Sequence, residues 1–285
     1  MLTTRALHLT VLNRSASLLL TWVILDDELF YRVVYDDFFE ERKSMEIEDF
    51  FKEKDVDDYA VLSVSSAESF AGVHPSNLLP NAKSIIIFAK QIPEFVFLID
   101  NRIKTNYLYS LIKEMDRISY DFSVSLNNEG FNTVPLPCFF PIKLEDGKLK
   151  GYLSFKHLAE QAGMGSIGLN SLLISEKYGN SLCLSGIITE KPLTVKYNKL
   201  EKSLCHECNK CVHSCPAKAI NNGCVEATKC INLSNQIPKL MRPLFAAFIK
   251  WNPTKKYMEI LINNLSWNID MVCSECLINC PYFRS

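Results

Sequence analysis

The sequence lacks an excess of charge of either sign. Its 285 residues include 31 Lys and Arg against 32 Asp and Glu, so the formal net charge at pH 7 is −1. A nearly neutral chain has no overall field that attracts a polyanion, and nucleic-acid binding therefore depends on a local patch. The basic residues towards the C-terminus are few, and we interpret them as a solvated face: Lys239, Arg242, Lys250, Lys255 and Lys256.

Long apolar runs are also missing. The most apolar stretch, Leu18 to Leu25, is much shorter than the roughly 20 residues that cross a bilayer, and Asp26 follows it directly. No small-residue cleavage pattern of a secretory signal is present either. We therefore expect a cytoplasmic protein with no membrane partner, in which the 11 cysteines are reduced and are better explained as metal ligands than as disulfides.

The first 44 residues differ from the rest of the chain. They mix apolar and acidic residues without a clear period, whereas "MEIEDFFKEK" from Met45 predicts an amphipathic opening helix. Two interpretations stay open for the segment 1–44. Either Met45 is the true start and an upstream reading frame precedes it, or the segment is a genuine N-terminal helix or dimerisation arm.

Strands and helices alternate between residues 45 and 197. Runs of β-branched residues predict strands at Tyr59–Ser65 and Ser84–Ile92 and within "FNTVPLP", "SLLIS" and "SLCLSGIIT". Apolar residues at three- and four-residue spacing predict helices at Ile103–Leu126 and Ser154–Ala162. The order predicts a mixed fold, α+β or α/β, for residues 45–197, followed by a separate cysteine-rich module at 198–285.

Two cysteine runs in this module have the spacing of iron–sulfur ligands. The first is C-x2-C-x2-C-x3-C-P, and the second is C-x2-C-x3-C-P. In the ferredoxin run three cysteines bind one cubane, and the fourth ligates another cluster. Eight thiolates then complete two four-iron four-sulfur clusters. One set is Cys205, Cys208, Cys211 and Cys280, and the other is Cys215, Cys230, Cys273 and Cys276.

Other interpretations of the cysteines remain. Cys224 is close enough in sequence to replace Cys230 as a ligand. Two zinc knuckles are the structural alternative, although zinc favours paired C-x2-C arms closed by four local ligands. Cys138 and Cys183 fall in predicted strand segments, and we interpret them as small buried hydrophobes.

The segment "GMGSIG", from Gly163 to Gly168, satisfies the G-x-G-x-x-G pattern, and Glu190 follows it at the distance of a ribose-binding acid. A dinucleotide-binding turn needs a strand before the first glycine and a helix after it. Here the predicted order is reversed. We therefore expect Gly163 to end a helix with a positive φ, and we interpret the loop as one that approaches some other ligand.

The segments "HPSNLLPNAKSIIIFAKQIP", "SFKHLAEQAGMGSIGLNSLLISEKYG" and "IITEKPL", with the two cysteine runs, resemble the epoxyqueuosine reductase family and the core of corrinoid-dependent reductive dehalogenases. The resemblance implies a nitroreductase-like cobalamin-binding domain over 45–197 and a ferredoxin-like domain that reduces cobalt. It also implies a corrinoid-contacting loop that contains Ala162, Gly163, Gly165, Gly168 and Asn170.

The implied function is a cobalamin-dependent reductase. An external low-potential donor supplies electrons through the two clusters to cobalt, and then to an unidentified small molecule or modified nucleoside. A ferredoxin-like electron carrier or corrinoid-reactivating protein is the alternative, and a flavin-using relative is a third. No D-x-H-x-x-G run is present to supply a histidine ligand to cobalt.

The sequence also departs from the family it resembles. The acidic proton donor expected about a dozen residues before the glycine loop has no direct match, which leaves Asp146, Lys156 and His157 as candidate catalytic residues. Only four residues follow Pro281, so the C-terminal helical repeats of the full-length enzymes have no counterpart here. With the neutral charge, this leads us to expect that tRNA is a doubtful partner.

Overall fold

The computed structural model describes residues 6–13, 16–25, 28–34, 46–68, 74–139, 141, 143–145, 148–196, 200–221, 223–230, 256–257, 259–260 and 273–283. Contacts divide the chain into two compact units, Met1–Met45 and Glu46–Ser285. Each unit has its own β-sheet.

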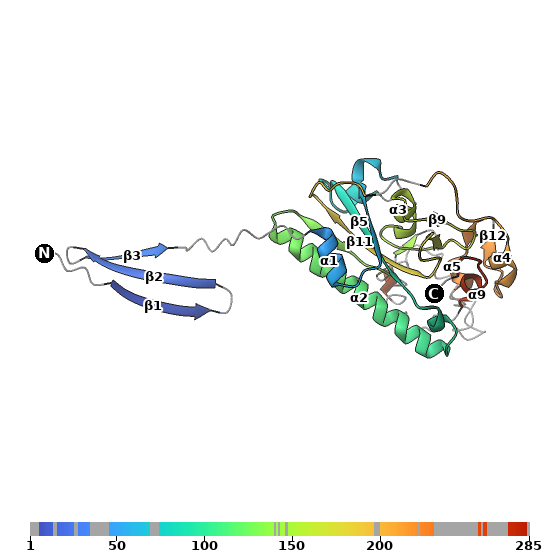
Figure 1. Ribbon diagram of the computed structural model, residues 1–285, viewed down its shortest axis with the longest axis horizontal. Coiled ribbons are helices and arrows are strands. Elements are labelled where there is room, and N and C mark those ends of the chain that lie inside the picture. The colour runs from blue at the N-terminus through green and yellow to red at the C-terminus, as the bar shows by residue number, and fades with distance from the viewer. Residues whose placement is uncertain are drawn as a thin grey trace. The chain divides into compact units, whose positions relative to one another are not determined.

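The first unit is a three-stranded antiparallel sheet in the order β1-β2-β3 (Figure 1). Its strands are β1 (Ala6–Asn13), β2 (Ala16–Leu25) and β3 (Glu28–Val34), and Ala6 pairs with Val23. The helical alternative for this segment is therefore wrong for the described residues. Its β-branched and aromatic residues favour strands even where apolar and polar positions do not alternate strictly. Whether the segment precedes the true start stays a prediction.

A four-stranded sheet forms the centre of the second unit. Its order is β4-β5-β11-β6, and every neighbouring pair is antiparallel. The strands are β4 (Asp58–Ser63), β5 (Ser84–Gln91), β11 (Leu182–Thr189) and β6 (Thr133–Leu136). The two central strands, β5 and β11, pair along their whole length.

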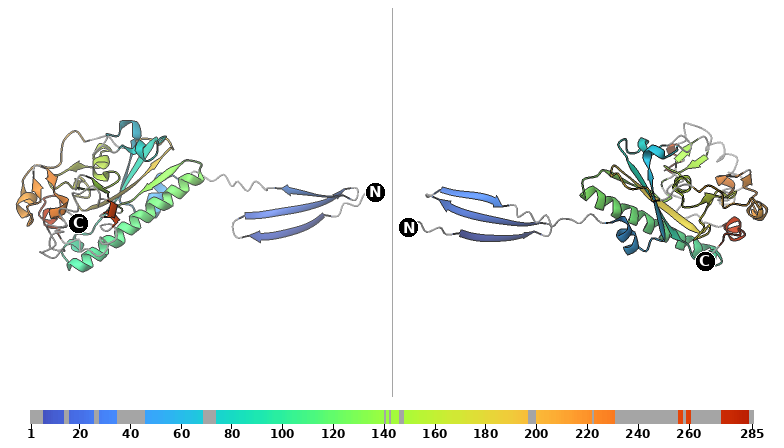
Figure 2. Two further views of the ribbon diagram at one scale, coloured as in Figure 1. Left: turned by 180° about the vertical axis from the view of Figure 1, so that it is seen from behind. Right: turned by 45° about the horizontal axis from the view of Figure 1, so that its top comes forward.

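Helices cover both faces of this sheet (Figures 1 and 2). One face carries α1 (Ile47–Glu53) and α2 (Asn101–Asn128), and the other carries α3 (Phe155–Gln161). Successive strand residues point to opposite faces, so Ile85 joins the core on the α3 side and Ile86 the core on the α2 side. Burial on both faces explains why β5 reads as a continuous apolar run.

Short elements complete the second unit. The 3-10 helices are η1 (Val64–Ser66), η2 (Pro75–Asn77) and η3 (Glu94–Phe97). Antiparallel hairpins join β7 (Lys143–Glu145) to β8 (Lys148–Lys150), β9 (Ser166–Ile167) to β10 (Leu173–Ile174), and β12 (Ile220–Asn221) to β13 (Cys224–Val225). The cysteine-rich part contains α4 (Lys210–Ser214), α5 (Ala227–Cys230) and α9 (Glu275–Ile278).

Helix α2 has clear capping signals at both ends. The Asp100 carboxylate accepts hydrogen bonds from the backbone N–H groups of Arg102, at 2.9 Å, and Ile103, at 3.4 Å. After the last turn Gly130 has a φ of +93°, and the Phe131 N–H donates back to a carbonyl of that turn. This ending satisfies carbonyls that the helix itself leaves unpaired. The face between the caps buries Leu111, Ile112, Met115, Ile118, Phe122 and Leu126.

Replacing Asp100 by alanine is expected to lower the free energy of unfolding by about 1 kcal/mol, because two N–H groups at the start of α2 lose their acceptor. Asp100→Asn keeps an oxygen in the same place and is expected to stay within roughly 0.5 kcal/mol of the parent. Urea unfolding of both variants measures the difference. An alanine variant as stable as the asparagine variant contradicts the capping role.

Most of the predicted elements of the second unit are confirmed, including the long helix α2 and the strands β4, β5 and β11. The predicted mixed fold of helices and strands is confirmed, and its antiparallel sheet makes the unit α+β, one of the two predicted forms. The helix α2 does connect two strands that run in the same direction, β5 and β6. However, β11 pairs between them and runs the opposite way.

Candidate metal centre

The first cysteine run lies in a tightly wound loop around α4. Glu207 and Asn209, on either side of Cys208, have φ values of 50° and 59°, a left-handed backbone conformation that residues with a side chain adopt rarely. The backbone N–H of Ala219 donates to Cys215 Sγ at 3.2 Å.

The second cysteine run packs against the first. Its short helix α9 contacts α4, and Ser214 Oγ donates to the Glu275 carbonyl at 3.3 Å. Beyond α9, the Tyr282 hydroxyl lies 3.0 Å from His206 Nε2 in the first run. Segments far apart in the sequence thus bring their thiols to one place.

One set of thiols combines three cysteines of the first run with one of the second. Cys280 interacts electrostatically with Cys205 and Cys208, and Cys211 interacts with Cys280 and Cys205. Burial is the main cause that raises the pKa of Cys211 and Cys280. These are the four residues predicted from the sequence for one cluster, and their role as ligands stays a prediction.

The other set contains Cys215, Cys230, Cys273 and Cys276. Cys230 interacts with Cys273 and Cys215, and Cys276 interacts with all three. Burial, followed by these neighbouring thiols, raises the pKa of Cys276 to about 12. Cys276 also interacts with Cys211, so the two sets adjoin. Cys215 lies in the first run but groups with the second, as a crossover ligand would.

Cys230 and Cys224, the two candidates for the fourth ligand of the second set, have different surroundings. Cys230 is partly buried among the thiols of the second set. Cys224 is exposed, and it interacts with Lys156. These surroundings favour Cys230.

In the described part of the chain, no three Cys, His, Asp or Glu side chains converge closely enough to hold a single metal ion. The choice between zinc and iron–sulfur clusters therefore stays a prediction from the spacing of the cysteines.

The glycine-rich segment is a tight turn between α3 and the β9-β10 hairpin. Gly163 follows the buried Ala162 at the end of α3 and has a φ of +82°, so the predicted helix-ending role is confirmed. At Gly165 an added Cβ would lie 2.1 Å from the Ile174 carbonyl oxygen, and at Gly168 it would lie 3.0 Å from the Ile174 side chain. The helix precedes the glycines and the strand follows them, the reverse of a dinucleotide-binding turn.

Polar side chains join this turn to both cysteine runs. Asn170 Nδ2 donates to the Cys276 carbonyl at 3.2 Å. Ser166 Oγ accepts a hydrogen bond from the Leu204 N–H at 2.7 Å, one residue before Cys205. Of the loop residues carried over from the family resemblance, Asn170 therefore contacts the cysteine-rich part directly. The contact made by Ser166 had no signal in the sequence.

Two neighbouring residues carry buried polar atoms that lack a partner among the described residues: Asn180 Oδ1 and Ser181 Oγ. The Asn180 amide donates to the Leu277 carbonyl at 3.2 Å. It also donates to Cys280, which opposes the rise in that thiol's pKa that burial causes. A buried polar group left unpaired costs about 1–3 kcal/mol, so these two atoms indicate a place for a polar group. Nothing in the sequence singled them out.

The candidate proton donors on α3 have structural partners. Lys156 Nζ donates to the carbonyl of Ser171 at 3.0 Å and contacts its hydroxyl, and Glu160 accepts a hydrogen bond from the Ile167 N–H at 2.7 Å. Helix α3 thus holds the glycine-rich turn at two points. Asp146 lies outside the described residues. A catalytic role for Lys156, His157 or Asp146 stays a prediction.

His157 is expected to make the protein less stable in weak acid. Burial, followed by the charge of Lys156, lowers the pKa of His157 from its ordinary 6.5 to about 4. Between these values the unfolded chain binds a proton that the folded chain does not, so the free energy of unfolding falls as the pH drops from 6.5 towards 4. Urea unfolding of the wild type and His157→Gln across this range measures the effect. We expect a shallower fall for His157→Gln, and parallel curves contradict the assignment.

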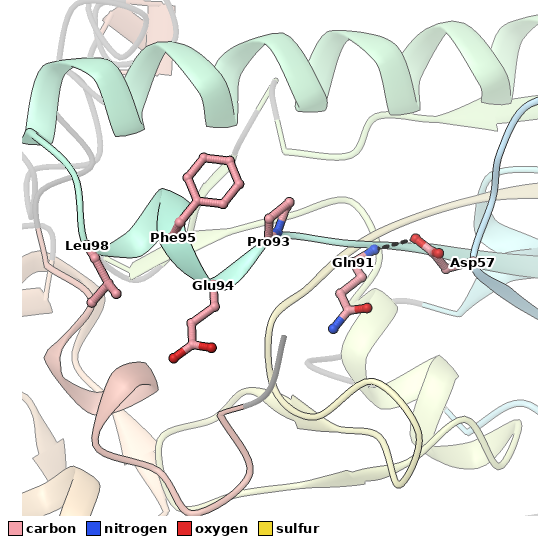
Figure 3. Close-up of a pocket in the computed structure, with 6 residues that line it drawn as sticks. All are labelled: Asp57, Gln91, Pro93, Glu94, Phe95 and Leu98. Carbon is pink, nitrogen blue, oxygen red and sulfur yellow. Dashed lines mark hydrogen bonds between the residues drawn. The ribbon is translucent and has the colours of Figure 1, made fainter.

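An open pocket of about 540 Å³ lies at the end of β5 (Figure 3). In it the Gln91 N–H donates to an Asp57 carboxylate oxygen at 2.7 Å, and Glu94 and Phe95 point to opposite sides. The next backbone N–H, that of Ile92, donates to the Ser181 carbonyl, so the pocket borders the segment with the two unpartnered atoms. A second pocket, of about 420 Å³, is lined by Leu78, Asp116, Tyr120, Val134, Pro135, Leu136, Pro137, Pro141 and Tyr152.

Cys138 and Cys183 lie together, away from the two thiol sets. Their sulfurs are 3.5 Å apart, and Cys138 Sγ donates to the Leu184 carbonyl at 3.2 Å. The hydrogen bond with Cys183, followed by burial, raises the pKa of Cys138. Both side chains are partly buried and pack against the core on the α2 side, as expected for small hydrophobic residues.

The fold and the site define the class as mixed α/β proteins with an antiparallel sheet and a cysteine-rich part. The glycine-rich turn is hydrogen-bonded to this part, in which eight thiols lie in two sets. No family model matches the sequence. Among the helices described, none combines the length and apolar character needed to cross a membrane.

Several curated relatives of the chain are named epoxyqueuosine reductase. The chain is 30% identical over 155 residues to the epoxyqueuosine reductase of Listeria monocytogenes, and this match covers 52% of the chain and 36% of the relative. The chain is 37% identical over 82 residues to the epoxyqueuosine reductase of Synechocystis, and this match covers 28% of the chain and 28% of the relative. The chain spans about a third of the length of the curated relatives it matches. The resemblance predicted from the sequence is confirmed.

Solved structures share the fold. Epoxyqueuosine reductase from Streptococcus thermophilus superposes with a TM-score of 0.54 at 18% identity, over 84% of this chain and 65% of that one. A catabolic reductive dehalogenase superposes with a TM-score of 0.52 at 11% identity, over 84% of this chain and 32% of that one. The mixed α/β fold thus agrees with the predicted resemblance to both groups.

The expectation that tRNA is a doubtful partner is wrong. An epoxyqueuosine reductase with this fold was solved with an epoxyqueuosine-modified tRNA stem loop; its TM-score is 0.52 at 21% identity, over 83% of this chain and 64% of that one. The expectation relied on the net charge of the whole chain, which does not report the potential of a local surface. It also relied on where the sequence ends, which does not decide what the chain binds.

Proposed function

We propose that this chain is an iron–sulfur oxidoreductase of the epoxyqueuosine reductase type. In this proposal residues 45–197 form a corrinoid-binding domain with a nitroreductase-like fold, and residues 198–285 form a ferredoxin-like domain with two four-iron four-sulfur clusters. An external low-potential donor supplies the electrons. The substrate is a modified nucleoside of the epoxyqueuosine kind, presented by a tRNA stem loop.

The observation that carries the proposal is the grouping of the thiols. Each of the two electrostatic sets takes cysteines from both runs, with Cys280 joining the first run and Cys215 joining the second. This exchange is the ligand pattern of two-cluster ferredoxins. When bound, the clusters supply one-electron transfer at low potential, and a corrinoid supplies a strongly nucleophilic cobalt centre.

The surrounding residues fit thiolate-bound clusters. The Ala219 N–H and the Asn180 amide each donate to a predicted ligand, Cys215 and Cys280 respectively. Hydrogen bonds to cluster sulfurs stabilise negative charge and adjust the reduction potential. Cys276 is partly buried, and the glycine-rich turn is hydrogen-bonded to its backbone through Asn170.

The corrinoid part of the proposal is supported by the unpartnered atoms. Asn180 Oδ1 can accept a hydrogen bond and Ser181 Oγ can donate or accept one, and both side chains are buried. Asn180 also contacts the predicted ligand Cys280. A corrinoid carries amide side chains around its ring, which offer both donors and acceptors. The glycines have a different role, because the Ile174 carbonyl already requires the absence of a side chain at Gly165.

Anaerobic purification with cobalamin supplied tests the cofactors. We expect about eight iron atoms and about eight acid-labile sulfides per chain, EPR signals from two reduced clusters, and a Co(II) signal. Clusters without cobalt would favour the electron carrier or corrinoid-reactivating alternative, and a flavin spectrum the nitroreductase-like one. Zinc without acid-labile sulfide would refute the proposal.

The substrate is tested separately with a tRNA stem loop. The loaded protein and a chemical reductant are incubated with a stem loop that contains epoxyqueuosine, and the nucleosides are separated by mass. Loss of one oxygen from the modified nucleoside is the expected product. An unmodified stem loop of the same sequence is the control for binding, and an unchanged nucleoside with fully loaded protein contradicts this substrate.

A further inference from the structure

Lys104 is a buried lysine in the first turns of α2. Only 3% of its surface is exposed. Its Nζ donates to Ser274 Oγ at 2.9 Å, although the two residues are 170 positions apart in the sequence. Ser274 directly follows Cys273, a member of the second thiol set, and it is the N-cap of α9.

A buried ammonium group is costly unless negative charge compensates it. Burial lowers the pKa of Lys104, and Cys273 and Glu275 of the second cysteine run oppose this by favouring its charged form. A hydroxyl such as that of Ser274 accepts a hydrogen bond but supplies no charge. Cys273 and what it binds therefore contribute to the negative charge that faces Lys104.

We infer that Lys104 is a positioning residue that docks α2 on the second cysteine run and sets the reduction potential of the group held by Cys273 and its set. The inference rests on the proposed function, because it needs a cluster at those thiols. Reduction of a cluster adds one negative charge. A nearby buried cation stabilises the reduced form more than the oxidised form, and it therefore raises the midpoint potential.

Three variants of Lys104 separate the effect of its charge from the effect of its hydrogen bond to Ser274. Lys104→Met removes both the charge and the hydrogen bond, Lys104→Gln keeps a donor without the charge, and Lys104→Arg keeps the charge. Lys113→Met is the matched control, because Lys113 is an exposed lysine on the same helix. Each variant is purified anaerobically, its iron and sulfide are measured, and both clusters are followed by EPR during a redox titration.

We expect Lys104→Met and Lys104→Gln to shift the midpoint potential of one of the two clusters downwards and to leave the other unchanged. Lys104→Arg should lie near the wild type, and Lys113→Met should equal it. If both neutral variants fail to assemble clusters while Lys104→Arg assembles them, the charge is needed at this place, which also supports the inference.

Fully loaded neutral variants with unchanged midpoints would overturn the role of Lys104, as would a failure of Lys104→Arg to assemble clusters. Neither result would affect the proposed function, because the wild type would still contain two clusters. Absence of clusters from the wild type would overturn the proposed function instead.

Discussion

Replacing Cys230 by alanine is expected to destroy one of the two clusters and to spare the other. Cys230 is partly buried and interacts with Cys273 and Cys215, so its loss removes one of four thiolates from the second set. Iron should fall from about eight towards about four atoms per chain, and one of the two reduced-cluster EPR signals should disappear.

Cys224→Ala is the matched control for this change. Cys224 is only six positions from Cys230 in the chain, but it is exposed and lies near Lys156. We expect its replacement to leave both EPR signals and the iron content unchanged. If Cys224→Ala loses a cluster and Cys230→Ala retains both, the fourth ligand of the second set has been assigned to the wrong residue.

Gly165→Ala is expected to cost about 3 kcal/mol or more of stability, or to prevent folding. The added Cβ would lie 2.1 Å from the carbonyl oxygen of Ile174 and 2.8 Å from its carbonyl carbon. Both atoms belong to the backbone of β10, so no side-chain rotation can relieve the clash, and the β9-β10 hairpin must open. The soluble yield and the urea midpoint of the anaerobic protein measure the loss.

The same substitution at Gly151 provides the comparison. There the nearest atom to an added Cβ is the Leu153 carbonyl oxygen at 3.3 Å, and a small adjustment relieves the contact. We expect Gly151→Ala to stay within roughly 1 kcal/mol of the wild type. Since Ser166 and Asn170 bond the turn to both cysteine runs, Gly165→Ala should also lower cluster content. Equal stability of the two variants contradicts the geometry of the turn.

Local patterns predicted the parts of the fold that depend on neighbouring residues. The spacing along α2 agrees with its buried face, and the apolar run of β5 agrees with burial on both sides of the sheet. Gly163 ends α3 as its place between a helix and a strand predicts. Such signals are strong because the helix period, the strand period and the φ of glycine are properties of a few consecutive residues.

The sequence pattern did not predict the direction of the strands in the central sheet or which strands pair with each other. An order of alternating strands and helices suggested an α/β sheet, yet β11 enters between β5 and β6 and makes every pair antiparallel. No local feature of β11 encodes which strands it will pair with. That choice depends on burying both faces of the sheet at once, which involves the whole unit.

By itself, the sequence determined the types of most elements in the second unit and the two cysteine runs, because spacing within a short segment carries that information. Only the tertiary structure decided which distant groups meet. Asn170 reaches Cys276 across 106 positions, and Lys104 reaches Ser274 across 170. Contacts of this kind follow from the packing of α2 and the glycine-rich turn against the second cysteine run, and packing depends on the three-dimensional fit of residues that no local period relates.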